Sequence, residues 1–382
     1  MKTCPYCGRE NDEFLVHCSG CGTELANPLP KSPELNRDSK VLPPSLVDLS
    51  SIESAFDFEE GFSRPNWQVI GAAAEKVEDP DDVKLVWDEI IMQWLSRVAR
   101  ELGGEYGLHK SRNFVILSSL NAETVKRVLE FSERSVGQIH DLLGEVAWGS
   151  YRGIQPVLIF SEEDDYYQYL SAFYPDGEHP TSRGIQLRGG YPHIALLYDN
   201  ELRSMQTIAH ELTHHCLAHL RLPRWLDEGV AQTLQKLVGE AYVPAAHHGR
   251  SAAYWAIVSG WTPPVMWEEL AERHHQFWNF TRIQSFWAGT SFNDPGESVE
   301  LSYNLSEVII NLLPRNSSDF RAFLSLADGA DAGQSAALDC LGACLGETVA
   351  TFLGPGDWRP RRKAIKECWA AKESTKSKSE SL

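Results

Sequence analysis

Apolar residues follow two periods along the central part of the chain, and each period predicts one kind of element. A repeat of three to four residues predicts helices at Pro80–Leu102, Ala122–Leu143 and Asp164–Phe173. Short apolar runs bounded by turn residues predict strands. These strands are expected at Asn113–Leu120, Gln155–Ser161, Gly184–Arg188 and His193–Leu197.

Two helices joined by a turn are predicted after the last strand. The first spans Leu202–Leu220 and the second Trp225–Val238. Pro223 lies between them and cannot continue a helix, so the second helix should fold back on the first. A later helix is expected from about Leu301 to Leu313. Strands first and mostly helices afterwards indicate an α+β fold.

The two ends of the chain have a different composition. Residues 26–62 are rich in Pro, Ser and acidic side chains, which predicts a linker. Within it, Asp48–Phe62 carries enough Leu, Ile and Phe to dock onto the folded body. Residues 371–382 alternate Lys, Ser and Glu and are expected to be disordered.

Composition and charge narrow the class of protein. A chain of 382 residues with 42% hydrophobic content can bury one large core or two medium ones. The formal net charge of −18 argues against general binding of nucleic acid or anionic membranes and favours cationic substrates. Because no window approaches 18 consecutive apolar residues, no membrane span is expected.

Cysteine usage bears on the compartment. Cys216, Cys340, Cys344 and Cys368 are scattered without the spacing of a disulfide framework. No signal peptide is recognisable, so a reducing cytoplasm is the expected location. We interpret Cys216, Cys340 and Cys344 as core residues. Cys340 and Cys344 lie four apart in a helical stretch, so half of a metal site is the alternative for them.

The segment His210-Glu211-Leu212-Thr213-His214 has the pattern of a metal site with a base beside it. On a helix, residues four apart lie on one face about 6 Å from each other, so His210 and His214 can bind one zinc ion. Glu211 can then take a proton from a zinc-bound water. Glu228, in the first turn of the next helix, is the candidate third ligand and leaves the fourth position for water.

These residues resemble those of a known peptidase class. A metzincin would need Gly and His where Leu217 and Leu220 stand, so the site is similar to that of a gluzincin, and His-Glu-Leu-Thr-His matches thermolysin-like peptidases. The gap to Glu228 is shorter than in thermolysin. The run from Leu222 to Ala231, Leu-Pro-Arg-Trp-Leu-Asp-Glu-Gly-Val-Ala, resembles the signature of the peptidase-MA-like family. The resemblance extends from about Asn113 to Trp369.

The resemblance implies further roles. His193–Leu197 would be an edge strand to which a peptide adds, although an interior strand is the alternative. Tyr303 is the candidate donor to the oxyanion, with a packing role as the alternative and His247, His248 and Tyr254 as weaker candidates. Gln232 stands where related enzymes place an Asp that orients a ligand. His215, Cys216 and His219 point away from the ligand face, with Cys216 in the core and the two His solvated or capping.

A separate metal site is predicted at the N-terminus, over residues 1–25. Two CxxC pairs, each followed by Gly, are separated by ten residues, which is typical of a zinc ribbon. Its four thiolates would close a structural site around a second zinc. Two basic residues stand against four acidic ones here, which favours a structural or protein-binding module over one that binds nucleic acid. The ligands are Cys4, Cys7, Cys18 and Cys21.

The leading hypothesis is a cytoplasmic zinc metallopeptidase that acts on a peptide or protein substrate. Its gluzincin-like domain is expected over 63–370, with an α/β part at 63–200, active-site helices at 201–239 and a helical part at 240–370. The alternative is a non-catalytic scaffold that keeps the peptidase fold and its zinc, with the ribbon recruiting a protein partner. A nucleic-acid regulator is disfavoured by the acidic ribbon.

Overall fold

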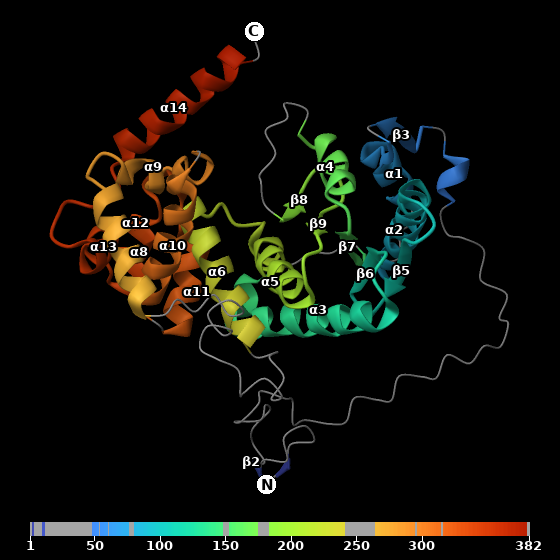
Figure 1. The fold of residues 1–382 in the computed structure, drawn as a ribbon, viewed down its shortest axis with the longest axis horizontal. Coiled ribbons are helices and arrows are strands. Elements are labelled where there is room, and N and C mark those ends of the chain that lie inside the picture. Colours follow the sequence, from blue (N-terminus) through green and yellow to red (C-terminus); the bar gives the residue numbers. More distant parts are fainter. Residues whose placement is uncertain are drawn as a thin grey trace.

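A five-stranded mixed sheet organises the N-terminal half of the molecule (Figure 1). The computed structural model describes residues 2–3, 10–11, 48–52, 54–59, 61–75, 80–147, 153–174, 183–240, 264–294, 296–314 and 316–379. In spatial order the strands are β5 (Gly107–Lys110), β6 (Phe114–Ser118), β7 (Gln155–Phe160), β9 (His193–Leu197) and β8 (Gly184–Leu187). The three central strands are parallel, and β5 and β8 pair antiparallel at the two edges.

Helices cover both faces of this sheet, which explains why its central strands are buried at every position. Phe114 and Ile116 of β6 join the core formed with α3 (Ala122–Leu143) and α5 (Glu201–Leu217). The alternate residues, Val115 and Leu117, join the core on the opposite face. That face is covered by α1 (Trp67–Ala74), α2 (Pro80–Leu102) and α4 (Glu163–Ser171).

The segment before the sheet docks onto α2, as its apolar residues predicted. It consists of a short 3₁₀ turn, η1 (Leu49–Ser51), and the antiparallel pair β3 (Phe56–Glu59) and β4 (Phe62–Pro65). Leu49 and Phe62 are 1% and 3% exposed and belong to the core around α2. The predicted linker therefore contributes to the folded body from residue 49 onward.

The C-terminal half is helical and packs around buried aromatic side chains. Trp225 at the start of α6 is fully buried, and its indole nitrogen donates to the Ala332 carbonyl. The elements are α6 (Arg224–Glu240), α8 (Pro264–Phe277), α9 (Ile283–Trp287), η4 (Ser291–Asn293), α10 (Glu297–Leu312), α11 (Ser317–Leu326), η5 (Gly329–Asp331), α12 (Gln334–Leu341), α13 (Leu345–Leu353) and α14 (Arg362–Ser379). A further 3₁₀ turn, η2 (Gly144–Val146), follows α3.

Three sequence expectations need correction. β9 is interior, because it pairs with both β7 and β8, so β8 is the edge strand of the described sheet. α14 continues to Ser379 through the segment expected to be disordered, and its Ala, Lys and Glu residues are good helix formers. α10 begins at Glu297, which places Tyr303 in its second turn.

The N-terminal segment contributes little to the described structure. Strands β1 (Lys2–Thr3) and β2 (Glu10–Asn11) form an antiparallel pair. The four cysteines of the predicted ribbon lie outside the described residues. Within the described ranges, no single helix has the length and apolar character to cross a membrane, and α12 with α13, bent by 94°, meets the criteria only as a pair.

Candidate metal centre

The centre forms where α5 and α6 fold back on each other. Asn200 caps α5, its side chain accepting from the backbone nitrogen of Arg203. After α5 ends at Leu217, Pro223 opens the next helix, with its carbonyl accepting from the nitrogens of Leu226 and Asp227. Glu228 therefore lies in the opening turns of α6, facing α5, as predicted.

His210, His214 and Glu228 bring three ligand atoms together, the two Nε2 atoms and Oε2. The imidazole nitrogens are 3.1 Å apart, and they lie 3.4 and 3.3 Å from the carboxylate oxygen. An ion bound tetrahedrally at about 2.0–2.1 Å requires ligand atoms about 3.3–3.4 Å apart. The three edges match that spacing closely.

The buried polar atoms of the cluster also fit a cation. Two imidazole nitrogens and a carboxylate oxygen that face one another repel unless a proton or a metal ion lies among them. Glu228 Oε2 is buried and has no hydrogen-bond partner within the described part of the chain. These residues can therefore hold a metal ion, and the site is less than 15% exposed at each of the three side chains.

Asp227 orients one ligand, and the sequence analysis missed it. Its Oδ1 lies 3.0 Å from His214 Nδ1, the ring nitrogen that faces away from the cluster. Gln232, the residue expected in this role, lies one helical turn further along α6 than Glu228. The sequence does place a carboxylate directly before the ligand Glu228, which could have marked Asp227 as a candidate.

The charges of the cluster move the pKa values of its members. Burial alone would lower the pKa of His214, but the carboxylates of Asp227 and Glu228 raise it well above its ordinary value. Burial would likewise raise the pKa of Glu228, but His214 and His210 hold it well below its usual range. Without a metal, a proton on His214 is therefore favoured by the neighbouring carboxylates.

Glu211 is held beside the cluster by the edge strand. Its side chain is buried, and Oε2 accepts a hydrogen bond of 2.8 Å from the backbone nitrogen of Gln186 in β8. One carboxylate oxygen remains for other partners. β8 is therefore the strand that borders Glu211, whose role as a base stays a prediction.

Tyr303 reaches the cluster from α10. Its hydroxyl donates to Glu228 Oε1 over 3.4 Å, and burial raises its pKa, which keeps it a neutral donor. Gly229 permits this approach, because a Cβ there would lie 2.8 Å from the Ser306 carbonyl oxygen of α10. The weaker candidates His247, His248 and Tyr254 lie outside the described residues.

Arg224 is a second neighbour that sequence reasoning missed. Its Nε lies 3.6 Å from Glu228 Oε1, and Nη1 donates to Asn293 Oδ1 over 3.2 Å. The guanidinium also sits 5.5 Å from the centre of the Phe292 ring. With 40% of its side chain exposed, Arg224 brings a positive charge to the edge of the site.

His215 corrects one more expectation, since it is buried rather than solvated. Its Nδ1 lies 2.8 Å from Gln186 Nε2, so it supports the strand that holds Glu211. Burial lowers the pKa of His215 to about 4. Cys216 is buried as predicted, with its pKa raised to about 12 by that burial, and His219 is exposed as expected.

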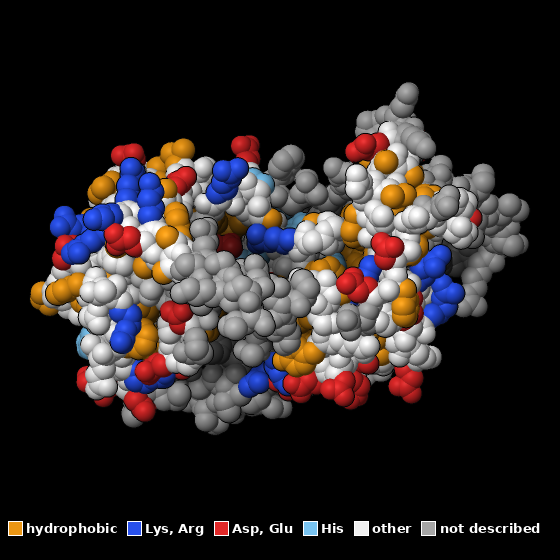
Figure 2. Space-filling view, turned by 90° about the horizontal axis from the view of Figure 1, so that it is seen from above, with side chains coloured by type: hydrophobic (Ala, Val, Ile, Leu, Met, Phe, Trp, Pro, Cys, Tyr) orange, Lys and Arg blue, Asp and Glu red, His pale blue; other side chains and the backbone are white. Residues whose placement is uncertain are grey.

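A hollow separates the two halves of the molecule in the view from above, and Lys or Arg, Asp or Glu and His side chains are visible in and around it (Figure 2). No family model matches the sequence, and no curated protein is similar to it. The likeness to peptidases therefore rests on the motif residues and on the geometry of this centre. The mixed α+β architecture is compatible with that likeness.

Proposed function

We propose that this protein is a zinc-dependent metallopeptidase of the gluzincin type. The observation that carries the proposal is the triangle of His210, His214 and Glu228, with Glu211 next to it. Zinc held by these ligands would supply a Lewis acid and lower the pKa of a coordinated water to about 7. The donor set of two imidazoles and one carboxylate is typical of hydrolytic zinc sites.

Glu211 is assigned the proton transfers. Its buried carboxylate would accept a proton from the attacking water and return it to the amine that leaves. The hydrogen bond from Gln186 nitrogen to Oε2 orients the group for both steps. Tyr303, whose hydroxyl contacts Glu228 Oε1, would donate a hydrogen bond to the oxyanion, and Arg224 would add positive charge there.

The edge strand β8 suggests how a peptide would lie. It pairs with β9 on one side and bears the residue that holds Glu211. An extended peptide that added to β8 by main-chain hydrogen bonds would pass its scissile bond beside the centre. The proposed docking strand is therefore β8, whereas the resemblance suggested β9.

Glu211→Gln tests the assignment. The amide keeps the size of the side chain but cannot accept the proton, so cleavage of a peptide library should fall by at least about a hundredfold. Metal content should not change, because Glu211 is not a ligand. Glu130→Gln, an exposed residue on α3, is the matched control and should keep full activity.

Unchanged cleavage by Glu211→Gln, with normal metal content, contradicts the proposal. If the wild type holds the metal but cleaves no peptide, the scaffold alternative takes its place. A stoichiometric protein partner isolated with such a protein would support that alternative.

A further inference from the structure

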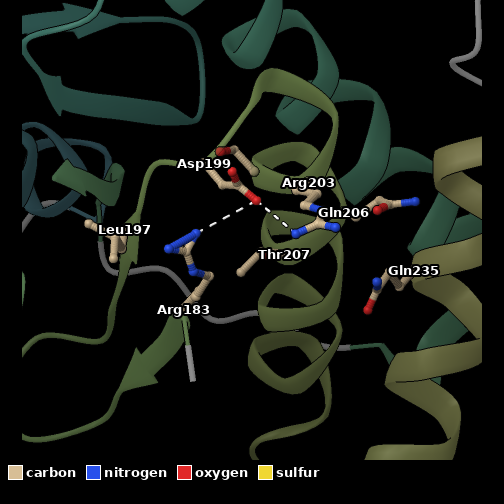
Figure 3. A pocket seen from close by; sticks show the side chains of 8 residues that line it. Arg183, Leu197, Asp199, Arg203, Gln206, Thr207 and Gln235 are labelled. Carbon is tan, nitrogen blue, oxygen red and sulfur yellow. Dashed lines mark hydrogen bonds and ion pairs between the residues drawn. The ribbon is translucent and has the colours of Figure 1, made fainter. Parts of the chain in front are cut away.

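A pocket of about 230 Å³ lies beside the candidate metal centre and has no role in the chemistry above. Arg203 and Gln206 of α5 line it together with Gln235 of α6 (Figure 3). Ser204 of α5 also belongs to the lining. Arg183, just before β8, and Asp199, just after β9, complete its polar wall. The pocket therefore belongs to the elements that build the centre.

The pocket continues the same helix faces that carry the metal ligands. Gln206 lies four residues before His210 on α5, and Gln235 lies seven residues after Glu228 on α6. Both spacings return to the same side of a helix. Four residues correspond to about 6 Å along α5, and an extended peptide advances about 3.3 Å per residue. A substrate would reach the pocket within about two residues of its scissile bond.

The charges of the pocket favour an anion. Arg203 Nη1 lies 2.8 Å and Arg183 Nη1 3.6 Å from the same atom, Asp199 Oδ2. Figure 3 shows the two guanidinium groups converging on this carboxylate from different elements. One carboxylate thus faces two guanidinium groups, which leaves one positive charge in a chain whose net charge is −18. Both arginine side chains are more than half exposed and accessible to a ligand.

An unpaired hydroxyl gives an independent indication of a ligand. Ser204 lines the pocket and is 2% exposed, and its Oγ has no hydrogen-bond partner among the described residues. A buried hydroxyl without a partner is destabilising, and a bound hydrogen-bond acceptor would satisfy it. The volume is below the roughly 300–1,000 Å³ of sites for drug-sized ligands and suits one side chain or a chain terminus.

We propose that this pocket binds a carboxylate of the peptide substrate, with Arg203 and Arg183 as the charged partners and Ser204 as a hydroxyl donor. The inference rests on the proposed function, since it makes the pocket the specificity site of that peptidase. The carboxylate belongs either to a Glu or Asp side chain near the scissile bond or to the C-terminus of the peptide. The protein would then select acidic or C-terminal residues.

Binding without turnover tests the proposal. The full-length Glu211→Gln protein is loaded with zinc, and peptide binding is measured by titration calorimetry. The peptides are acetylated pentaalanine amides in which one alanine at a time is replaced by Glu, Gln or Lys. At one position Glu should bind at least about fivefold more tightly than Gln, and Lys should bind most weakly. The affinity of acetyl-pentaalanine with a free C-terminal carboxylate, compared with that of its amide, tests whether the pocket binds the C-terminus of the peptide.

Variants separate charge from structure. Arg203→Gln and Arg183→Gln should each remove most of the preference for the carboxylate. Asp199→Asn should increase that preference, because it removes the competing negative charge, whereas a merely structural role of Asp199 would weaken all binding. Arg112→Gln, an exposed arginine between β5 and β6, is the matched control and should change nothing.

Two outcomes overturn the proposal. One is the absence of any advantage of a carboxylate over its amide at all positions, including the case in which no peptide binds at millimolar concentration. The other is a carboxylate preference that survives both arginine substitutions. If the wild type cleaves a peptide library without any preference for a carboxylate, the proposed role of the pocket is refuted and the proposed function stands. If peptides with a carboxylate bind more tightly but none is cleaved, the pocket binds carboxylates and the peptidase proposal is refuted.

Discussion

At the scale of single residues, the centre divides into side chains placed by local spacing and side chains placed by tertiary contacts. His210, Glu211 and His214 lie within one helical turn of each other, so their proximity follows from the sequence alone. Glu228 needs only a short turn between two helices. Asp227 contacts His214 across two helices, which no helical period encodes. Arg224 lies four residues before Glu228 on the same helix, so its spacing was visible in the sequence, but its role depends on the fold around it.

Asp227→Asn is expected to weaken metal binding without removing a ligand. The carboxylate lies 3.0 Å from His214 Nδ1, and loss of such a partner typically lowers metal affinity by about 10- to 100-fold. Competition with a chelating dye measures the affinity. Gln232→Ala, one turn further along α6, is the comparison and should bind the metal normally. Equal affinity in wild type and Asp227→Asn would show that Asp227 does not orient the ligand.

At the scale of elements, the sequence located four strands of the sheet and the helices beside them, but it missed β5 and did not give the order of the strands. The predicted helix at Pro80–Leu102 has the observed bounds, and so does the strand at His193–Leu197. Neighbours in a sheet depend on how the chain crosses over, which apolar runs do not encode. The edge strand is therefore β8, whereas β9 was expected there.

Gly229→Ala should disturb the contact between α6 and α10. Its Cβ would meet the Ser306 carbonyl oxygen at 2.8 Å, and such overpacking typically costs about 1–3 kcal/mol. We expect lower stability in urea unfolding together with reduced peptide cleavage, because α10 carries Tyr303. Tyr303→Phe, which removes the hydroxyl and leaves the helix in place, should reduce cleavage alone. A Cβ at Gly71 in α1 would meet no neighbour within 4 Å, so Gly71→Ala is the control and should not destabilise the protein. Unchanged stability of Gly229→Ala would refute the close approach of α6 to α10.

At the scale of the whole molecule, two cores share the sheet, and buried histidines make their stability sensitive to acid. Burial lowers the pKa of His193 and of His274 to about 4. The unfolded chain binds these protons below about pH 6.5, whereas the folded protein stays neutral there, so stability is present at neutral pH and lost as the pH falls from about 6.5 to 4. Each histidine can contribute up to about 3 kcal/mol to this loss.

Urea unfolding between pH 7.5 and 4.5 measures the effect. The His210→Ala, His214→Ala variant is the suitable protein, because it removes the two titrating histidines of the candidate centre. We expect its unfolding free energy to fall with pH, and a smaller dependence when His274 is replaced by Gln. A flat profile would show that the two buried histidines are not neutral in the folded state.

The most direct test of the account is the metal content per chain together with peptide-library cleavage, for the wild type and the His210→Ala, His214→Ala variant. We predict that the variant contains one zinc fewer per chain than the wild type and cleaves no peptide, while the zinc expected on the four N-terminal cysteines remains. Equal zinc content in the two proteins, or cleavage that survives the loss of both histidines, would contradict it.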